Sequence, residues 1–581
     1  MTYKITHKNS TVAGTPPVAG DIDVGEIAIN AADAELYTKD TAGNIRKFQN
    51  TATGTAAGVR FTQAGTGAIT RTVDSKLKDA VSVKDFGAVG DGTTNDTAAI
   101  QAALNTTAKV VELGQGNTYL VTAALVSSVA DRVIVGDGST ITTNGAILAA
   151  NAVLTLSGAR SKVLNLRFTG VAGTTLCSAI QLTSGDSCEI SGCHISDFTN
   201  GAGIVATSSA TKHIITNNHL NNCNPVSFGG LQYGSIHCNA DKSLISGNRI
   251  ANADLTGVST FGGKYLTIKS NYIEGKSGSA TAGGIILDGY TVGCVIDSNT
   301  INGCKVEGIQ IAGSVSGYGG QSRDHIISNN CILEAEYSGI TLYGADTDAV
   351  VNINITGNQI KALVTTGRGI ELNRCNGINI TGNYVFGYAT GIQVPNAAPN
   401  VTVNSNVFEA QLTYGVLAHG RYWTVSGNRI IGRAGGTTTG IVFNGSAIAG
   451  DQLISNNFIR NCLKGIEGTF STTQPTHVRN NRFNANATDL TYSGDSPNSS
   501  SGNAFNDILS GTFTLSAGIA AVYNSNIRAN DKINIWFLNW GAGSQSTVGQ
   551  QQIIEISAGN RFVVESTKAT DVSQLAYEIV R

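Results

Sequence analysis

The sequence has little charge, proline or methionine. Only 13% of its 581 residues are charged, 38 basic and 40 acidic, and it holds 7 prolines and 1 methionine. A net charge of −2 with 41% apolar residues excludes a disordered chain, which needs high net charge and few apolar side chains. Lysine and arginine form no run, so we expect no nucleic-acid partner.

Long apolar runs and paired cysteine motifs are also absent. No apolar run approaches ~18 residues, so we expect no membrane span. The chain begins with polar sequence, MTYK, so we expect no secretory signal. The 10 cysteines include no C-x-x-C pair and do not cluster with histidine at zinc spacing. We therefore expect buried reduced thiols, no metal and no cofactor.

What the sequence does have is glycine, 70 residues, and a repeat built around asparagine. The repeat has an apolar residue, two small or polar residues, Asn, any residue and another apolar residue, as in ISGNRI at 245–250 and ITGNQI at 355–360. Its interval averages about 26 residues. The repeated asparagines are Asn218, Asn248, Asn271, Asn299, Asn330, Asn358, Asn383, Asn406, Asn428, Asn457 and Asn481, and Cys193 replaces Asn in an earlier copy.

A second element, G-I-x-Φ (Φ is apolar), recurs between the copies. It begins at Gly284, Gly308, Gly339, Gly369, Gly391 and Gly440. Its alternation has period 2, which is typical of a short strand. Each unit thus holds two or three short strands separated by Gly/Asn turns, where these residues tolerate positive φ.

One such unit cannot bury its apolar face, but stacked units form a continuous core. The pattern therefore predicts an all-β fold, a parallel β-helix with strands ~4.8 Å apart. Asparagines at equivalent positions are expected to bond to one another along the stack. The lack of a 3.6-residue period excludes helical solenoids, and the units are too short for propeller blades.

The ends of the chain differ from the repeats. Residues 1–50 predict a few short hairpins, 51–80 a neck or linker, 81–503 the solenoid and 504–581 a C-terminal β-sandwich-like domain. Asn95 or Asp96 is expected to N-cap a short helix over 97–104, which would close the first coil.

Three segments resemble phage tail proteins. VKDFGAVGDG followed by NDTAAIQAA, within 83–103, closely resembles the start of pectate-lyase-like right-handed β-helix proteins, including bacteriophage tailspikes. GEIAIN at 25–30, with LYTKD and GNIRKF after it, resembles the N-terminal virion-attachment module of tail fibres and spikes. Residues 559–580 resemble tail-protein C-termini. Together with the repeats they span nearly the whole chain.

This resemblance implies a homotrimeric tailspike that binds, and often cleaves, bacterial surface polysaccharide. It also implies attachment to a tail or baseplate protein through the N-terminal module, location in the phage tail of the virion and assembly in the host cytoplasm. The C-terminal domain then serves trimerisation or capping, or binds carbohydrate through Trp540 or Tyr523.

Acidic residues are few on the outward positions of the G-I-x-Φ strands, where Ile and Φ point inward. Glu371 and Asp288 occupy such positions, and Asp346 follows one of these strands. Glu371 and Asp346 are expected roughly 5–10 Å apart, which spans the retaining and inverting separations of glycosidases. Asp288 is expected about three coils, roughly 14 Å, from Glu371. We predict these three carboxylates as catalytic residues.

The expected substrate-binding residues are aromatic or cationic. They are Tyr343, Tyr290, Arg374, His237 and His419. A polysaccharide depolymerase acting as a glycoside hydrolase is the favoured function. A lyase with Arg374 and Tyr343, a spike that binds glycan without cutting it, and a structural tail component stay open as alternatives.

Overall fold

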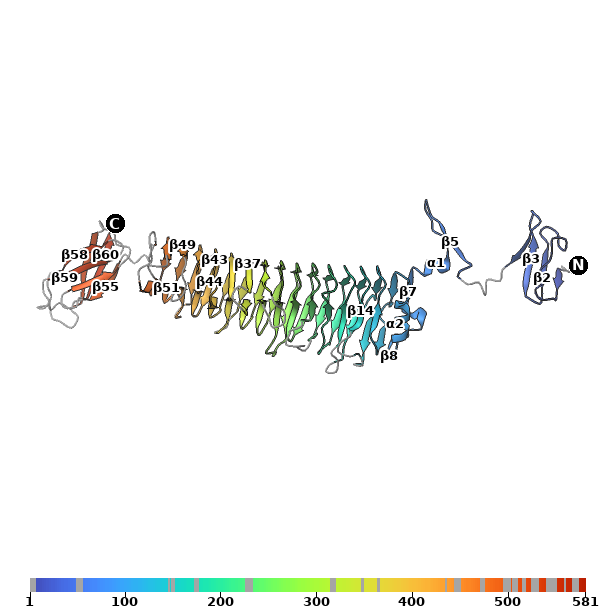
Figure 1. The fold of residues 1–581 in the computed structure, drawn as a ribbon, viewed down its shortest axis with the longest axis horizontal. Helices are drawn as coiled ribbons and strands as arrows, with labels where there is room; N and C mark the ends of the chain where they lie inside the picture. Colours follow the sequence, from blue (N-terminus) through green and yellow to red (C-terminus); the bar gives the residue numbers. More distant parts are fainter. Residues whose placement is uncertain are drawn as a thin grey trace. The chain divides into compact units, whose positions relative to one another are not determined.

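The repeats form a stack of three-stranded coils in the computed structural model (Figure 1). It describes residues 7–48, 56–144, 147, 152–171, 177–224, 234–313, 320–345, 349–362, 366–433, 436–443, 451–470, 476–494, 503, 510–514, 519–523, 532–539, 551–557, 561–566 and 574–580. Contacts divide the chain into two units, 1–82 with 107–112, and 83–106 with 113–581. The second unit contains the solenoid.

Each coil contributes one strand to each of three parallel sheets, which we name I, II and III in chain order. Sheet I contains β12 (Val133–Val135), β15 (Lys162–Leu164), β18 (Glu189–Ser191), β21 (Ile214–Thr216), β24 (Leu244–Ser246), β27 (Thr267–Lys269), β30 (Val295–Asp297), β33 (Ser322–Arg323), β34 (Ile326–Ser328), β37 (Val350–Thr356), β40 (Cys375–Thr381), β43 (Val401–Asn404), β46 (Thr424–Ser426), β49 (Gln452–Ser455) and β52 (Thr476–Arg479).

Sheet II contains β8 (Asp91–Asn95), β10 (Thr118–Val121), β13 (Thr140–Thr143), β16 (Arg167–Thr169), β19 (His194–Ser196), β22 (His219–Asn221), β25 (Arg249–Ala253), β28 (Tyr272–Gly275), β31 (Thr300–Asn302), β35 (Cys331–Leu333), β38 (Gln359–Lys361), β41 (Tyr384–Phe386), β44 (Val407–Gln411), β47 (Arg429–Gly432), β50 (Phe458–Arg460) and β53 (Arg482–Asn484).

Sheet III contains β11 (Leu125–Ser127), β14 (Ala152–Leu156), β17 (Ser178–Leu182), β20 (Ile204–Ala206), β23 (Ile236–Cys238), β26 (Thr256–Phe261), β29 (Gly283–Asp288), β32 (Glu307–Gly313), β36 (Ser338–Gly344), β39 (Arg368–Asn373), β42 (Thr390–Asn396), β45 (Tyr414–Ala418), β48 (Thr439–Phe443), β51 (Lys464–Phe470) and β54 (Thr488–Gly494). The G-I-x-Φ element is the sheet III strand, so the predicted parallel β-solenoid is confirmed.

The repeated asparagines form a continuous ladder at the corner between sheets I and II. In each coil the asparagine N–H and Nδ2 donate to Oδ1 of the next coil's asparagine, as Asn299 does to Asn330 at 2.9 Å in both bonds. Nδ2 also donates to a sheet I carbonyl of the preceding coil, such as Ile268 O. The ladder starts at Cys193, whose N–H donates to Asn218, and continues to Asn503. The predicted bonding between stacked asparagines is therefore confirmed.

The corner needs an unusual backbone conformation just before each ladder asparagine. There φ lies between 53° and 67°, whether the residue is glycine, as at Gly357, or not, as at Asn329. Glycine and asparagine reach this left-handed region most easily, which accounts for their frequency in the repeat. The ladder side chain then satisfies backbone groups that a sharp turn would otherwise bury without a partner.

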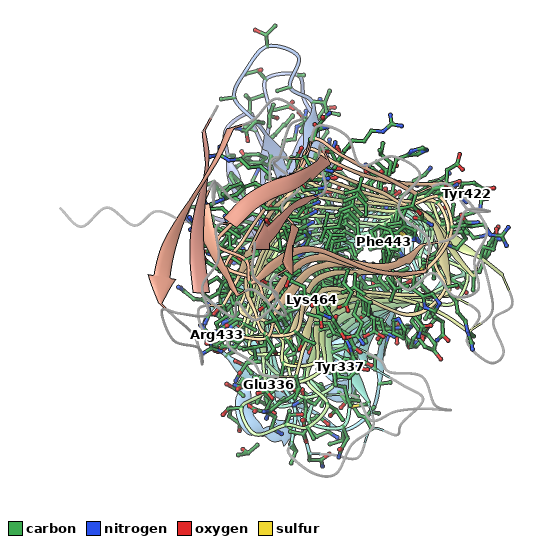
Figure 2. The ribbon with its side chains drawn as sticks, turned by 90° about the vertical axis from the view of Figure 1, so that its left-hand side faces the viewer. Glu336, Tyr337, Tyr422, Arg433, Phe443 and Lys464 are labelled. Carbon is green, nitrogen blue, oxygen red and sulfur yellow. The ribbon has the colours of Figure 1, made fainter. Side chains whose placement is uncertain are left out.

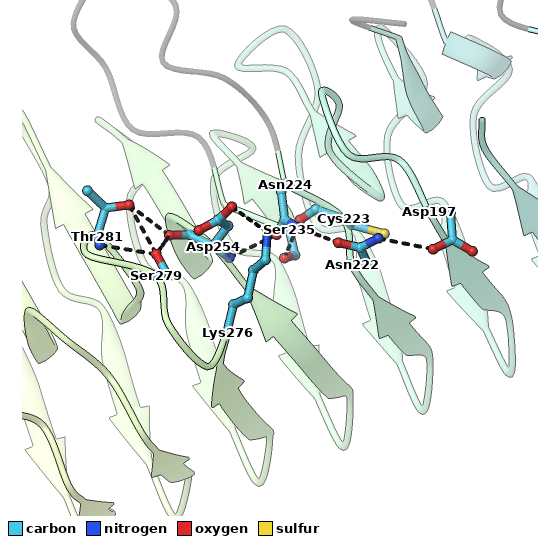
Figure 3. Close-up of polar contacts among 9 residues, drawn as sticks. All are labelled: Asp197, Asn222, Cys223, Asn224, Ser235, Asp254, Lys276, Ser279 and Thr281. Atoms are coloured by element: carbon cyan, nitrogen blue, oxygen red, sulfur yellow. Dashed lines mark hydrogen bonds and ion pairs between the residues drawn. The ribbon is translucent and has the colours of Figure 1, made fainter. Parts of the chain in front are cut away.

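A second polar chain runs along the corner between sheets II and III (Figure 3). Asn222 donates to Asp197 at 3.0 Å, Asn224 donates to Asn222 at 2.9 Å, and Asp254 N–H donates to Asn224 at 2.8 Å. The Asp254 carboxylate pairs with Lys276 at 2.8 Å. The pKa of Asp254 is lowered, first by this bond to Lys276. Lys276 therefore balances the charge of Asp254, whereas Asp197 accepts from the neutral amide of Asn222.

The first coil is covered by helix α2 (Thr97–Leu104), with the predicted bounds. Asn95 Oδ1 accepts from Thr97 N–H at 3.2 Å, whereas the Asp96 carboxylate accepts from Val89 and Gly90. Of the two predicted residues, Asp96 is at the N-cap position, but its side chain makes no cap bond to the helix. At the other end, the buried Arg132 guanidinium donates to the last carbonyls of the helix, including Leu104 O at 2.8 Å.

The first unit begins with a four-stranded sheet. It is formed by β1 (Lys8–Ser10), β2 (Ile27–Asn30), β3 (Glu35–Lys39) and β4 (Ile45–Phe48) around Ile22, Ala28 and Tyr37. Then follow the hairpin of β5 (Arg60–Thr62) and β6 (Thr70–Thr72), helix α1 (Val73–Leu77), and the parallel pair β7 (Ala80–Ser82) and β9 (Val110–Glu112). A 3-10 turn, Val83–Phe86, opens the second unit.

The chain ends in two three-stranded antiparallel sheets. They comprise β55 (Ser510–Thr514), β60 (Gln574–Val580) and β57 (Lys532–Asn539), and β56 (Ile519–Tyr523), β59 (Arg561–Ser566) and β58 (Gln551–Ser557). A sandwich packing of these sheets, the homotrimer and the domain limits stay predictions. Trp540 lies outside the described residues.

None of the 10 cysteines forms a disulfide, and nine of them are buried, as expected for reduced thiols. Burial raises the pKa of several of them, Cys193 and Cys223 to about 12. Across the described residues, no helix has the length and apolarity that a membrane crossing requires.

Candidate functional site

The outer face of sheet III carries the predicted site residues in straight columns, because its strands pair in register. One column, which we call the glutamate column, passes through paired residues on successive strands: His237, Ser259, Ile286, Gln310, Thr341, Glu371 and Gln393. A second, the tyrosine column, lies two residues further along the same strands and includes Phe261, Asp288, Ala312, Tyr343 and Asn373. The inward residues between them, such as Ile340 and Leu342, are fully buried.

Glu371 is buried although it lies on this outer face, with 5% of its surface exposed. Its Oε2 is 3.2 Å from Arg368 Nη1 but has no hydrogen bond among the described residues. Burial raises the pKa of Glu371, and the Arg368 charge opposes this. On the adjacent coil, the hydroxyl of Thr341 is also buried and unbonded within the described part of the chain. Two neighbouring polar groups are thus left to bond a ligand.

Arg368 is held by three contacts. Besides Glu371, its Nε donates to Gln393 Oε1 at 2.7 Å, and its guanidinium stacks 4.6 Å from the ring centre of Tyr337. Tyr337, at the corner before β36, is 46% exposed. These contacts fix one cation beside a buried carboxylate and next to an accessible aromatic ring.

Glu307 is a second acidic group of this site. It starts β32 and lies in register with Ser338 and then Arg368, two coils further on. Its pKa is raised by burial and by the charge of Glu371, and lowered less by Arg368. Glu307 was not among the catalytic residues predicted from the sequence. The available signal was its position directly before the glycine of G-I-x-Φ, the position that Arg368 occupies in its own coil.

Asp288 lies three strands from Glu371 in sheet III, as predicted. It is half-buried, and burial raises its pKa to about 6. Tyr343 lies in the same column two strands further on and is 42% exposed. Tyr290 lies beyond the end of β29, with Lys264 Nζ 4.6 Å from its ring centre. An acid and two aromatic rings therefore extend the face beyond Glu371.

The other predicted site residues lie apart from this cluster. His237 is in the glutamate column but only 1% exposed, its Nδ1 is 2.8 Å from Ser259 Oγ, and burial lowers its pKa to about 3. His419 is half-buried after β45. Arg374 is exposed and donates to the Ala345 carbonyl. Asp346 lies outside the described residues, so its predicted proximity to Glu371 stays a prediction.

A similar charge pair occurs four strands further along the same sheet. Lys464 and Glu467 on β51 occupy the register positions of Arg368 and Glu371 and also form an ion pair. Their side chains are 34% and 35% exposed, against 22% and 7% for Arg368 and Glu371. Figure 2, viewed down the axis of the solenoid, labels Tyr337 and Lys464. Burial, not the pairing itself, therefore distinguishes the Glu371 site.

No cluster of three or more His, Cys, Asp or Glu side chains that could hold a metal ion occurs among the described residues. The chemistry available at this face is that of carboxylates, a guanidinium and aromatic hydroxyls. Two carboxyl groups whose pKa is raised by burial, both acted on by the charge of Arg368, are suited to proton transfer with a ligand.

Three family models match consecutive parts of the chain. Residues 80–310 match the rhamnogalacturonase A/epimerase, pectate lyase-like family, 282–430 the right-handed beta helix region, and 503–580 the C-terminal domain of K1 capsule-specific polysaccharide lyase. A model of the periplasmic copper-binding protein NosD also matches residues 360–514.

Curated relatives and solved structures give shorter or more distant matches. The chain is 46% identical over 65 residues (11% of the chain) to a tail spike protein of an Escherichia phage, and 29% identical over 116 residues (20%) to a long tail fiber protein of an Enterobacteria phage. Each match spans 8% of the relative's length. The tailspike of E. coli bacteriophage HK620 in complex with pentasaccharide is 14% identical with a TM-score of 0.49, covering 90% of this chain and 98% of that one.

These matches follow the order of the parts seen in the structure. The pectate-lyase-like models cover coils of the parallel solenoid, and the K1 lyase model covers the strands after the last ladder asparagine. In chain order, the protein is therefore similar to a pectate-lyase-like right-handed β-helix followed by a C-terminal domain of the K1 capsule lyase type, and over 65 residues to a phage tail spike protein.

Proposed function

We propose that the protein is a virion tail component that binds a bacterial surface polysaccharide and cleaves it, with Glu307, Arg368 and Glu371 as the catalytic centre. The observation that carries this proposal is the buried Glu371–Arg368 pair on the outer face of sheet III, with unbonded polar atoms on Glu371 and Thr341. The names of the relatives, a phage tail spike protein and a capsule-specific lyase domain, support a polysaccharide ligand.

We favour hydrolysis, because this reaction requires one protonated and one ionised carboxyl group, and the site holds two glutamates, Glu307 and Glu371. Glu307 is the proposed general acid, since burial and the negative charge of Glu371 raise its pKa and so favour its protonated form. Glu371 is the proposed base that activates water, since Arg368 stabilises its ionised form. Glu307 and Glu371 are two coil steps apart and three residues apart along the strand, about 10 Å in each direction, so their backbones are roughly 14 Å apart. Their side chains must reach toward each other to approach the ~6.5–9.5 Å separation of inverting glycosidases, and the charge of Glu371 does act on Glu307.

Asp288 and Tyr343 are proposed to bind sugars next to this centre. Asp288 is three strands from Glu371, too far to share one proton transfer with it. An exposed tyrosine ring offers an apolar face for a sugar, and a carboxyl group offers bonds to hydroxyls.

Lyase chemistry is the second candidate, and two observations favour it. The match at 503–580 is to the C-terminal domain of a capsule lyase, although this segment lies outside the solenoid. Arg368 also stacks on Tyr337, which places a cation for a uronate carboxylate beside a phenol that can act as base once deprotonated.

The test uses the purified full chain and the capsular and O-antigen polysaccharides of candidate hosts. Release of reducing ends without absorbance of unsaturated uronate identifies a hydrolase, and release with that absorbance identifies a lyase. Tight binding with neither signal overturns the enzymatic proposal in favour of a glycan-binding spike.

Variants then locate the centre. Glu371→Gln and Glu307→Gln should each lower kcat by at least about 100-fold, the usual contribution of a general acid or base. Glu467→Gln is the matched control, since it removes the equivalent carboxylate from the exposed pair on β51 and should leave kcat unchanged. If both glutamate variants of the proposed centre keep their kcat while Arg368→Gln and Tyr337→Phe abolish cleavage, the lyase centre replaces the hydrolase centre.

A further inference from the structure

Four cationic or potentially cationic side chains stand in one row on the outer face of sheet II. Arg167, His194, His219 and Arg249 begin the successive strands β16, β19, β22 and β25, and each pairs in register with the next. We call this row the cationic column. Its three steps of ~4.8 Å give a length of about 14 Å.

These side chains have few partners of opposite charge. Within the described residues, Arg249 alone has a carboxylate near it, Glu274 at 4.0 Å. The rings of His194 and His219 are 5.0 Å apart, edge to face. The pKa of each histidine is lowered, first by burial and then by its cationic neighbours, Arg167 beside His194, and His194 and Arg249 beside His219. The lowered pKa favours neutral histidines, so the positive charge of the row is that of Arg167 and Arg249, which a bound anion would neutralise.

A row of small polar residues runs alongside. Thr169, Ser196 and Asn221 lie two residues further along the same strands and face the same side. All three are half-buried, so the hydroxyl and amide groups line the edge of the cationic column. Hydroxyl and amide groups next to arginines provide both kinds of contact that an acidic sugar chain needs, hydrogen bonds to hydroxyls and charge-assisted bonds to carboxylates.

We propose that the cationic column is a second glycan site, which binds a carboxylate-bearing polysaccharide laid across the coils. It lies on sheet II, whereas the catalytic centre proposed above lies on sheet III, so it would hold the polymer without cutting it. Arginine is suited to this task because its planar fork bonds a carboxylate with two parallel hydrogen bonds. A nucleic acid is disfavoured as occupant by the low overall content of basic residues. This proposal does not depend on cleavage at sheet III.

Binding measurements on the full chain test the proposal. The probe is polygalacturonate, with neutral dextran for comparison, titrated by calorimetry at low salt in the Glu371→Gln background to prevent cleavage. Arg167→Gln/Arg249→Gln should weaken polygalacturonate binding at least about tenfold, since each lost charge-assisted bond is worth that much. Dextran should bind no more weakly to the variant than to its parent.

The matched control is Arg429→Gln. Arg429 begins β47 on the same sheet, but its register neighbours are Val407 and Phe458 and not histidines. This variant should keep its polygalacturonate affinity within twofold, and both variants should keep the parental melting temperature because the changed residues are exposed.

An unchanged affinity for polygalacturonate in Arg167→Gln/Arg249→Gln would overturn the proposal. If that variant also has a lower molar mass in sedimentation, the cationic column is instead a contact between copies of the chain.

Discussion

Removal of one ladder asparagine, Asn330→Ala, should destabilise the solenoid by several kcal/mol. The Asn330 side chain takes part in four hydrogen bonds: its Oδ1 accepts from Asn299 N–H and Nδ2, and its Nδ2 donates to Ile296 O and Asn358 Oδ1. All four are 2.9 Å long and buried. At about 1 kcal/mol each, and with the Asn299 N–H left buried without a partner, the expected loss is about 4 kcal/mol.

The assay is denaturant unfolding followed by circular dichroism, with the unfolding rate measured as well because stacked repeats can unfold irreversibly. Asn354→Ala is the matched control, since this asparagine is exposed on the sheet I strand of the next coil and its Oδ1 accepts one exposed bond from Asn379 at 3.3 Å. It should change stability by less than about 0.5 kcal/mol. A cost below about 1 kcal/mol for Asn330→Ala, or equal costs for both variants, would refute the account of the ladder as a major stabilising element.

Two further stability predictions follow. Gly369→Ala should cost about 1–3 kcal/mol of stability in the same unfolding assay, because its Cβ would lie 2.2 Å from Val385 Cγ1 and 2.7 Å from the carbonyl oxygen of Gly391. Wild-type stability of this variant would contradict such close packing around Gly369. Acid should also destabilise the protein through the buried side chains of His213 and His325. Burial lowers the pKa of each to about 4, from about 6.5 in an unfolded chain. Since the unfolded state binds these protons more readily, this stability is complete above pH ~6.5 and is lost as pH falls towards 4, by about 3 kcal/mol per histidine. His325→Gln, which keeps an acceptor for the Cys294 N–H, should flatten the pH dependence due to buried histidines by about a third, because His213 and His237 contribute in the same way, and an unchanged slope would contradict the assignment.

The repetitive features of the fold could be predicted from the sequence because each coil repeats the same sequence pattern. The asparagine positions indicated the I–II corner, and the alternation of G-I-x-Φ indicated the outward columns, so the register of Thr341 with Glu371 was predictable. The reason why the G-I-x-Φ motif begins with glycine was not predictable. Gly308 and Gly369 lie within strands without positive φ, and a side chain there would meet the next coil's glycine carbonyl at 2.7 Å.

The candidate site was predicted less completely, since burial on an outer face depends on what lies over each column. Glu371 was correctly placed facing outward, yet its near-complete burial and its pair with Arg368 were not predictable from spacing. Glu307 was overlooked because the chemistry of its position appears only when Arg368, 61 residues away in sequence, is seen in register two coils further on. His237 faces outward as predicted, but it is buried against Ser259.

The asparagine ladder has a direction, and this bears on how the solenoid is made. The corner N–H and side-chain amide of each coil donate to an oxygen supplied by the following coil, as Asn457 donates to Asn481. On a growing chain, the newest coil therefore always carries unsatisfied donors, and each of them is satisfied only when the next 22 to 31 residues have been added. A chain that ends between two coils keeps unsatisfied donors on its last coil. Asn503, before the C-terminal sheets, supplies the last acceptor, which satisfies the donors of Asn481.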